Sequence, residues 1–237
     1  MVENWSGTAV RALGVKVALA MAVEALIFAA LLFGAAGTFL WPAGWGYLIL
    51  FFGGALWIVL LLARHNPALL AERMRMPMQK NQPLWDRFFL LAMSIVWCGW
   101  LVLMGLDTVR FRWSHMPGWL PWAGGALLVW SLHLSARAFR ENPFLAAVVK
   151  IQTERGHRVI STGPYAVVRH PFYAAVLIFL PANALVLGSW YGLAASAVLI
   201  GGVFLRTAME DGELRRGLEG YTEYAARVRY RLIPHVW

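Results

Sequence analysis

The chain has 237 residues, of which 60% are hydrophobic and only 14% are charged. This composition excludes an ordinary soluble domain and is typical of a helical membrane protein with many interfacial aromatic residues. The net charge of +9 would be compatible with a protein that binds nucleic acid. The basic residues flank apolar segments and do not form one stripe, which argues against a nucleic-acid partner.

Six apolar segments are long enough, or nearly so, to cross about 30 Å of hydrocarbon. They are Val10–Phe33, Trp45–Ala63, Phe88–Val109, Leu120–Phe139, Tyr173–Leu187 and Tyr191–Leu205. The first segment is too long for a signal peptide and lacks a cleavage site, so we expect it to remain as a span. Between the last two, which are short, Gly188-Ser189-Trp190 predicts a tight hairpin. A single bent helix in this region would give five spans instead.

The distribution of basic residues favours six spans. With a cytoplasmic N-terminus, six spans place 19 of the 21 Lys and Arg inside and only Arg110 and Arg112 outside. This asymmetry is what the positive-inside rule expects. Five spans would put the six arginines from Arg206 onward outside. We therefore predict an all-α polytopic membrane protein with about six transmembrane helices and both termini in the cytoplasm.

Shorter elements are expected in the cytoplasmic segments. Ala68–Met74 predicts a short interfacial helix within the segment 64–87. The segment 140–172 continues out of the fourth span and breaks at Gly156 and at Gly163-Pro164. In 207–230 the apolar residues recur at three- or four-residue spacing, which predicts a cytoplasmic C-terminal amphipathic helix.

The sequence Arg169-His170-Pro171 stands where the fifth span begins. Proline at the first helical position presets the backbone and loses no helical hydrogen bond. The free N–H groups of Phe172 and Tyr173 would then form an anion site for a carboxylate or phosphate, with Arg169 adding charge. A plain helix start with an interfacial arginine explains the same residues.

Three further residues carry candidate chemistry. Tyr165 follows a Gly-Pro turn, so its ring either stacks on a ligand base or cation or anchors the chain at the interface. Arg206 and Glu210 lie four residues apart on one helix face, and they either form an intrahelical ion pair or bind a ligand. Arginine suits a carboxylate because it binds both oxygens. Glutamate suits ribose hydroxyls or an amino group.

No metal or nucleotide motif is present. The six histidines have no H-E-x-x-H spacing, and the single cysteine, Cys98, cannot build a zinc site. The chain also lacks a P-loop and a glycine-rich dinucleotide loop after a strand. We expect Cys98 to serve in packing, since it lies inside an apolar segment.

The most specific signal is GHRVISTGPYAVVRHPFY at 156–173, a polar, basic segment between apolar ones. It is followed by Arg206-x-x-x-Glu210-Asp211-x-x-Leu214, by Tyr221-x-x-Tyr224 and by the terminal RVRYRLIPHVW. With these residues the last hundred or so positions resemble the isoprenylcysteine carboxyl methyltransferase family of integral membrane enzymes. The RHPxY element alone is less specific, because phospholipid methyltransferases and membrane sterol reductases carry related versions.

The resemblance implies an S-adenosylmethionine cofactor, with S-adenosylhomocysteine as product. By motif position it assigns the cofactor pocket to Gln152, His157, Arg158, Val159, Ile160, Tyr165, His170, Pro171, Phe172, Tyr173 and Glu210. It assigns Arg206 to the acceptor carboxylate and makes Arg206 and Glu210 the catalytic pair. Asp211 stands where the family usually has a second glutamate. One domain over 1–237 follows, with acceptor-shaping spans in 1–139 and the cofactor-binding and catalytic region in 140–237.

The resulting hypothesis is a multi-pass membrane methyltransferase with its active site facing the cytoplasm. The expected acceptor is lipophilic, either a small molecule or a prenylated residue, and a carboxylate is favoured over a phospholipid amine or a thiol. A carboxylate needs no base, whereas an amine or thiol would need His170, His157 or Glu210. An NADPH-dependent reductase of the sterol-reductase type and a non-enzymatic transporter or lipid scaffold are the competing classes.

Overall fold

The computed structural model describes residues 7–76, 78–79 and 81–237. Its α-helices are α1 (Gly7–Ala36), α2 (Pro42–His65), α3 (Pro67–Arg73), α4 (Leu84–Gly105), α5 (Leu120–Glu141), α6 (Pro171–Leu187), α7 (Trp190–Gly217) and α8 (Tyr221–Arg227). A π-helical turn, η1 (Leu106–Arg110), extends α4. Two 3-10 turns, η2 (Thr153–Arg155) and η3 (Gly163–Ala166), lie between α5 and α6. The described residues contain no strand, which confirms the all-α class.

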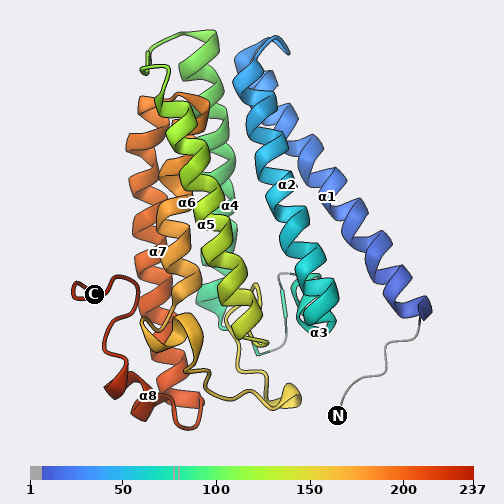
Figure 1. Ribbon diagram of the computed structural model, residues 1–237, viewed down its shortest axis with the longest axis vertical. Helices are drawn as coiled ribbons and strands as arrows, with labels where there is room; N and C mark the ends of the chain where they lie inside the picture. Colours follow the sequence, from blue (N-terminus) through green and yellow to red (C-terminus); the bar gives the residue numbers. More distant parts are fainter. Residues whose placement is uncertain (1–6, 77, 80) are drawn as a thin grey trace.

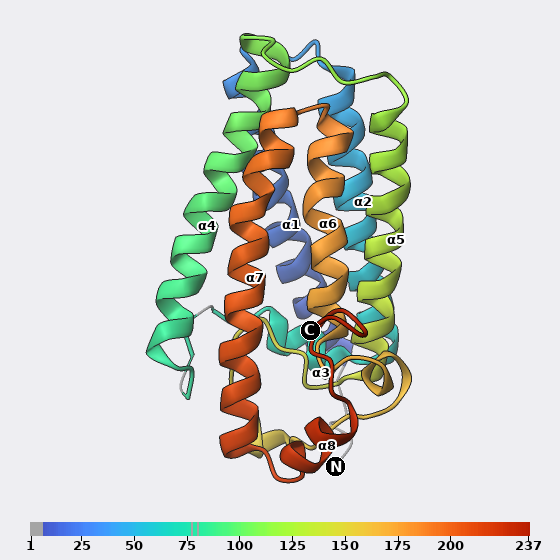
Figure 2. The ribbon, with the colours of Figure 1, turned by 90° about the vertical axis from the view of Figure 1, so that its left-hand side faces the viewer.

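The long helices lie side by side and alternate in direction (Figure 1). In the second view α4, α7, α6 and α5 follow one another across the front of the bundle, with α1 and α2 behind them (Figure 2). The helices α3 and α8 lie at one end, and the connections 106–119 and 188–189 lie at the other. We call the end that carries α3 and α8 the structured end, and the end that carries the connections 106–119 and 188–189 the plain end.

Four helices have the length and composition to cross a membrane: Arg11–Ala36, Pro42–His65, Leu84–Arg110 and Trp190–Gly217. The helix α6 is apolar but has only 17 residues, and α5 carries charged residues in its last turn. Both run beside the four longer ones (Figure 2). The chain is an integral membrane protein, and the count of six spans stays a prediction.

The last apolar region is two helices and not one bent helix. Gly188 follows α6 in the left-handed region at φ +77°, which is open to glycine without a steric penalty. Ser189 then caps α7, because its Oγ accepts a hydrogen bond from Gly192 N at 2.7 Å. This geometry makes the tight hairpin that the sequence predicts.

The single helix expected over 207–230 is wrong. The helix α7 continues from the apolar span without a break as far as Gly217. Gly220, at φ +77°, then turns the chain, and α8 occupies only Tyr221–Arg227. The spacing of apolar residues persists across the turn because both helices bury one side, so periodicity alone did not reveal the break. A short helix, expected at 68–74, is confirmed as α3 (Pro67–Arg73), and its interfacial position stays a prediction.

Small residues set the closest helix contacts, as is usual where lipid supplies no hydrophobic drive. A Cβ added at Gly124 of α5 would lie 2.6 Å from Leu185 Cβ of α6. A Cβ at Gly105 of α4 would lie 2.7 Å from Leu32 O of α1. The first contact brings α6 close against α5, and the second brings α4 close against α1.

Candidate functional site

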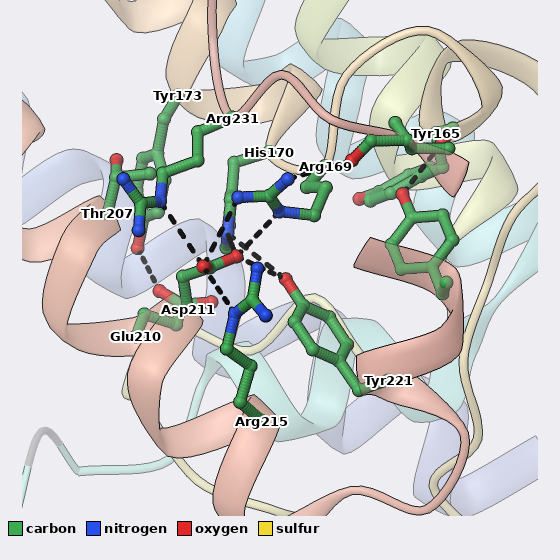
Figure 3. A network of polar contacts seen from close by, with 12 residues as sticks. Tyr165, Arg169, His170, Tyr173, Thr207, Glu210, Asp211, Arg215, Tyr221 and Arg231 are labelled. Atoms are coloured by element: carbon green, nitrogen blue, oxygen red, sulfur yellow. Dashed lines mark hydrogen bonds and ion pairs between the residues drawn. The ribbon is translucent and has the colours of Figure 1, made fainter. Parts of the chain in front are cut away.

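Asp211 lies at the centre of a polar network at the structured end of the bundle (Figure 3). It is fully buried, and its two carboxylate oxygens contact five side chains. The partners are Arg169 Nε at 2.7 Å, Tyr221 Oη at 2.8 Å, Arg215 Nε at 3.2 Å, Arg231 Nε at 3.2 Å and His170 Nε2 at 3.4 Å. The network joins α7 to the segment before α6 and to the C-terminal tail. Asp211 therefore acts as the structural centre of this end of the protein.

Arg169 completes the connection to the tail. One guanidinium nitrogen, Nη1, donates to the backbone oxygens of Val228 at 2.7 Å and Arg229 at 2.8 Å. The backbone N–H of Arg169 also donates to Tyr230 O at 2.9 Å. The sequence predicts that Arg169 adds charge beside the start of α6, but its side chain is buried and its charge is paired with Asp211.

A pocket lies beside this network. It is lined by Asn142, Leu145, His157, Arg158, Val159, Ile160, Tyr165, Arg169, His170, Phe172, Tyr173, Glu210, Leu214, Leu218, Tyr221 and Tyr224. The fold thus brings together every residue that the family resemblance assigns to the cofactor, except Gln152 and Pro171. Pro171 instead forms the first turn of α6. Their roles toward a ligand stay predictions.

Gln152 braces the loop next to the pocket and does not line it. It is completely buried, and its Nε2 donates to Phe144 O at 2.7 Å. Its backbone N–H donates to His157 Nδ1 at 3.2 Å. The side chain therefore holds the loop 142–157 closed on itself, and the geometry does not support direct contact with a ligand.

His157 is held neutral by its surroundings. Its ring stacks on Phe144 with 4.6 Å between centroids. Burial, with the nearby Arg155, lowers the pKa of His157 to about 4. Since Nδ1 accepts a hydrogen bond, Nε2 carries the proton, so the ring can offer a donor but is a poor base. A ring held in this state is a weak general base at pH 7.

Arg206 and Glu210 do not pair with each other. Tyr173 Oη donates to Glu210 Oε2 at 2.6 Å. Arg206 Nη2 lies 3.1 Å from Asp86 Oδ1 and 2.9 Å from Ala147 O, to which it donates. The two side chains are thus free to serve different ligands, which is the arrangement that the ligand-binding interpretation requires.

Asp86, which the sequence reading did not single out, is the partner of Arg206. It is fully buried in the first turn of α4, and its Oδ2 also accepts from Gln82 Nε2 at 2.8 Å and Val149 N at 3.0 Å. A lone acid directly before a long apolar segment is costly unless it is paired, and that signal was available in the sequence.

Two further cavities continue from the first pocket. A middle cavity of about 290 Å³ is lined by Arg73, Asn142, Phe144, Leu145, Ala146, Ala147, Val148, Val149, Lys150, His157, Phe172, Tyr173, Arg206, Glu210 and Leu214. An apolar cleft of about 460 Å³ between α4, α6 and α7 is lined by Phe89, Leu90, Met93, Ser94, Trp97, Cys98, Phe172, Tyr173, Val176, Phe179, Leu180, Leu199, Val203 and Arg206. Phe172 and Tyr173 line all three spaces, and Arg206 lines the middle cavity and the cleft.

The apolar cleft opens at the side of the bundle. Ser94, on its rim, is exposed and lies within the apolar length of α4. A lipophilic molecule could therefore enter at membrane depth, while the polar pocket lies at the structured end. Tyr173 and Phe172 mark the point where the two routes meet.

The sequence model of the isoprenylcysteine carboxyl methyltransferase family matches residues 124–216. This part of the chain belongs to that family. The match runs from α5 through α7 and includes Asp211, Glu210, Arg206 and the start of α6. The match supports a membrane methyltransferase in the broad sense. No match to a curated protein was found.

Proposed function

We propose that the protein transfers a methyl group from S-adenosylmethionine to the carboxylate of a lipophilic acceptor of the isoprenylcysteine type. The observation that supports this most is the meeting of a polar pocket with an apolar cleft at Phe172 and Tyr173. Arg206 lies at the same junction. A water-soluble donor and a membrane-soluble acceptor would approach this point from opposite sides.

The residues of the polar pocket fit the cofactor. Among the described residues no cation pairs with Glu210, whose only hydrogen bond comes from Tyr173. This carboxylate therefore offers an oxygen and a negative charge, which suit ribose hydroxyls or an amino group. Tyr165 lies at the other side of the pocket, where its ring suits an adenine. When bound, S-adenosylmethionine supplies a methyl group already activated by the positive charge on its sulfur.

The protein would then act through positioning. An acceptor carboxylate is ionised at pH 7, so it requires no base and needs only the correct distance and direction to the methyl carbon. Arg206 can hold one carboxylate oxygen while Asp86 fixes the other side of its guanidinium. Phe172 and Tyr173 would exclude water from the reacting atoms. Such arrangements commonly contribute several kcal/mol, up to about 7–11 kcal/mol in the best cases.

A titration separates this function from its competitors. Purified protein in detergent is titrated by calorimetry with S-adenosylhomocysteine and, separately, with NADPH. We expect the first to bind and the second not to bind. Transfer of labelled methyl groups is then measured on prenylated acids, phospholipid amines and lipophilic thiols, with the acids expected to react. Binding of NADPH alone would replace the proposal with a reductase, and binding of neither would favour a scaffold or transporter.

A further inference from the structure

Arg73, the last residue of α3, reaches into the middle cavity from a part of the chain that the family match does not cover. Its guanidinium lies over the ring of Phe139 at 4.6 Å and 5.9 Å from the ring of Phe172. One nitrogen, Nη1, donates to Leu145 O at 3.0 Å. These contacts fix the plane of the group and leave its remaining N–H donors for the cavity.

The charge of Arg73 is not compensated within the described part of the chain. In that part, no Asp or Glu oxygen lies within ion-pair distance of the Arg73 guanidinium. Arg75, two residues further along the chain, does pair with Glu72, at 3.3 Å. Burial and repulsion from Arg206 lower the pKa of Arg73 to about 10, which still leaves it cationic at pH 7. Arg73 is partly buried, and a cation withdrawn from water without a partner is costly.

A second guanidinium lines the same cavity. Arg206 already has a counter-charge in Asp86, whereas Arg73 has none. Glu210 also lines this space, but its hydrogen bond goes to Tyr173 and it makes no ion pair with Arg73. Two guanidinium groups in a cavity of about 290 Å³ form a site that an anion would stabilise.

We propose that Arg73 and Arg206 together bind the anionic group of the acceptor, and that Arg73 makes the enzyme select a carboxylate over an amine. This inference rests on the proposed methyltransferase function. A planar carboxylate can bridge two guanidinium groups, whereas an ammonium group would meet two like charges. The stacking on Phe139 holds Arg73 in place before the acceptor arrives, so little side-chain entropy is lost on binding.

The test compares an acid with its uncharged counterpart. The probes are N-acetyl-S-farnesylcysteine and its primary amide, whose binding is measured by calorimetry in the presence of S-adenosylhomocysteine. In the wild-type protein we expect the acid to bind at least 10-fold more tightly than the amide. In Arg73→Gln this preference should disappear, while the affinities for the amide and for S-adenosylhomocysteine stay within about twofold.

Two variants guard this comparison. Arg75→Gln removes a charge close to Arg73, but from an exposed side chain outside the cavity, and should leave the acid preference unchanged. Arg73→Lys keeps the charge and loses the planar group, so it should retain part of the preference. It also serves as the informative variant if Arg73→Gln does not fold, which melting curves would reveal.

Each remaining outcome has a definite meaning. A loss of S-adenosylhomocysteine affinity in Arg73→Gln, with the acid preference intact, would assign Arg73 to the carboxylate of the cofactor and overturn the proposal. Equal binding of acid and amide by the wild-type protein, or binding of neither, would also overturn it. Failure of the wild-type protein to bind S-adenosylhomocysteine would instead overturn the proposed function itself.

Discussion

At the scale of single residues, the positions that line the pocket were easier to predict than the residues that hold them. The motif around 156–173 and the Arg206-x-x-x-Glu210 spacing are local, so both could be read from the sequence. Asp86 and Arg73 come from α4 and α3, and only the fold brings them to the same place. The central position of Asp211 was missed for the same reason, since its partners are spread over the segment before α6, α7, α8 and the C-terminal tail.

Glu210→Gln is expected to weaken S-adenosylhomocysteine binding by roughly 10- to 100-fold, the range for one lost charged contact of about 1.5–3 kcal/mol. The amide can still accept the hydrogen bond from Tyr173, so the local structure should persist. The control is Glu213→Gln, one turn further along α7. The Glu213 carboxylate accepts hydrogen bonds from Trp85 and Arg216 and does not line the pocket. Calorimetry provides the measurement, and equal losses in the two variants would contradict the assignment.

Arg206→Ala should lower stability as well as turnover, because it leaves Asp86 as an unpaired buried carboxylate. Breaking such a pair commonly costs about 3–5 kcal/mol. Asp86→Asn in the same background should restore much of the melting temperature without restoring methyl transfer. Affinity for S-adenosylhomocysteine should change little in the double variant. Recovery of turnover together with stability would show that Arg206 has only a structural role.

His157 predicts a pH dependence of stability. Its pKa is lowered from 6.5 to about 4 in the folded protein. As the pH falls below 6.5 the unfolded chain binds a proton that the folded protein does not, so stability decreases until about pH 4. Above pH 6.5 the ring is neutral in both states and contributes no slope. Melting temperatures of wild type and His157→Gln between pH 7.5 and 4.5 should converge toward low pH; parallel curves would exclude this cause.

At the scale of elements, apolar length predicted the helices well and their ends poorly. The hairpin at 188–189 was readable because glycine and a capping serine stand together. The break after Gly217 was not, because residues on both sides of it pack into one apolar cluster containing Leu218, Tyr221 and Tyr224. The loop 142–160 has no periodicity, and its course is set by buried hydrogen bonds such as Gln152 to Phe144.

Two glycines test how closely η3 must be held for the pocket to form. Gly163 has φ +55°, and a Cβ there would lie 2.8 Å from Glu141 Oε2, whereas Gly156 has φ +63° and open space around it. Alanine at either position carries the backbone cost of roughly 1–2 kcal/mol. Only Gly163→Ala also displaces Glu141 and, with it, the turn that carries Tyr165. We expect both variants to melt earlier but only Gly163→Ala to lose S-adenosylhomocysteine affinity, as measured by calorimetry.

At the scale of the whole molecule, the candidate functional residues gather at one end of the helical bundle, and the apolar helices make up the rest. Figure 1 shows α3 and α8 at one end of the bundle. The polar network, the pocket and the middle cavity are built mainly from residues of the segments at that end. The other end carries the connections 106–119 and 188–189 and a compact polar cluster, in which Ser114 and Ser189 both donate to Asp107. Since the cleft opens along the side, the acceptor need not leave the bilayer to reach the junction.

The same asymmetry gives a prediction for orientation. Among the described residues, Arg110 and Arg112 are the only Lys or Arg in the segments at the plain end, so the positive-inside rule places the structured end in the cytoplasm. Single cysteines are introduced at His115 and Thr222, both exposed, in a Cys98→Ser background. An impermeant thiol reagent applied to intact cells should label position 115 at once and position 222 only after permeabilisation. Labelling of both from outside would require an even number of spans between them, instead of the three that α5, α6 and α7 provide. Labelling of position 222 alone would show the opposite orientation. The proposed cofactor pocket would then face away from the cytoplasm, where S-adenosylmethionine is supplied.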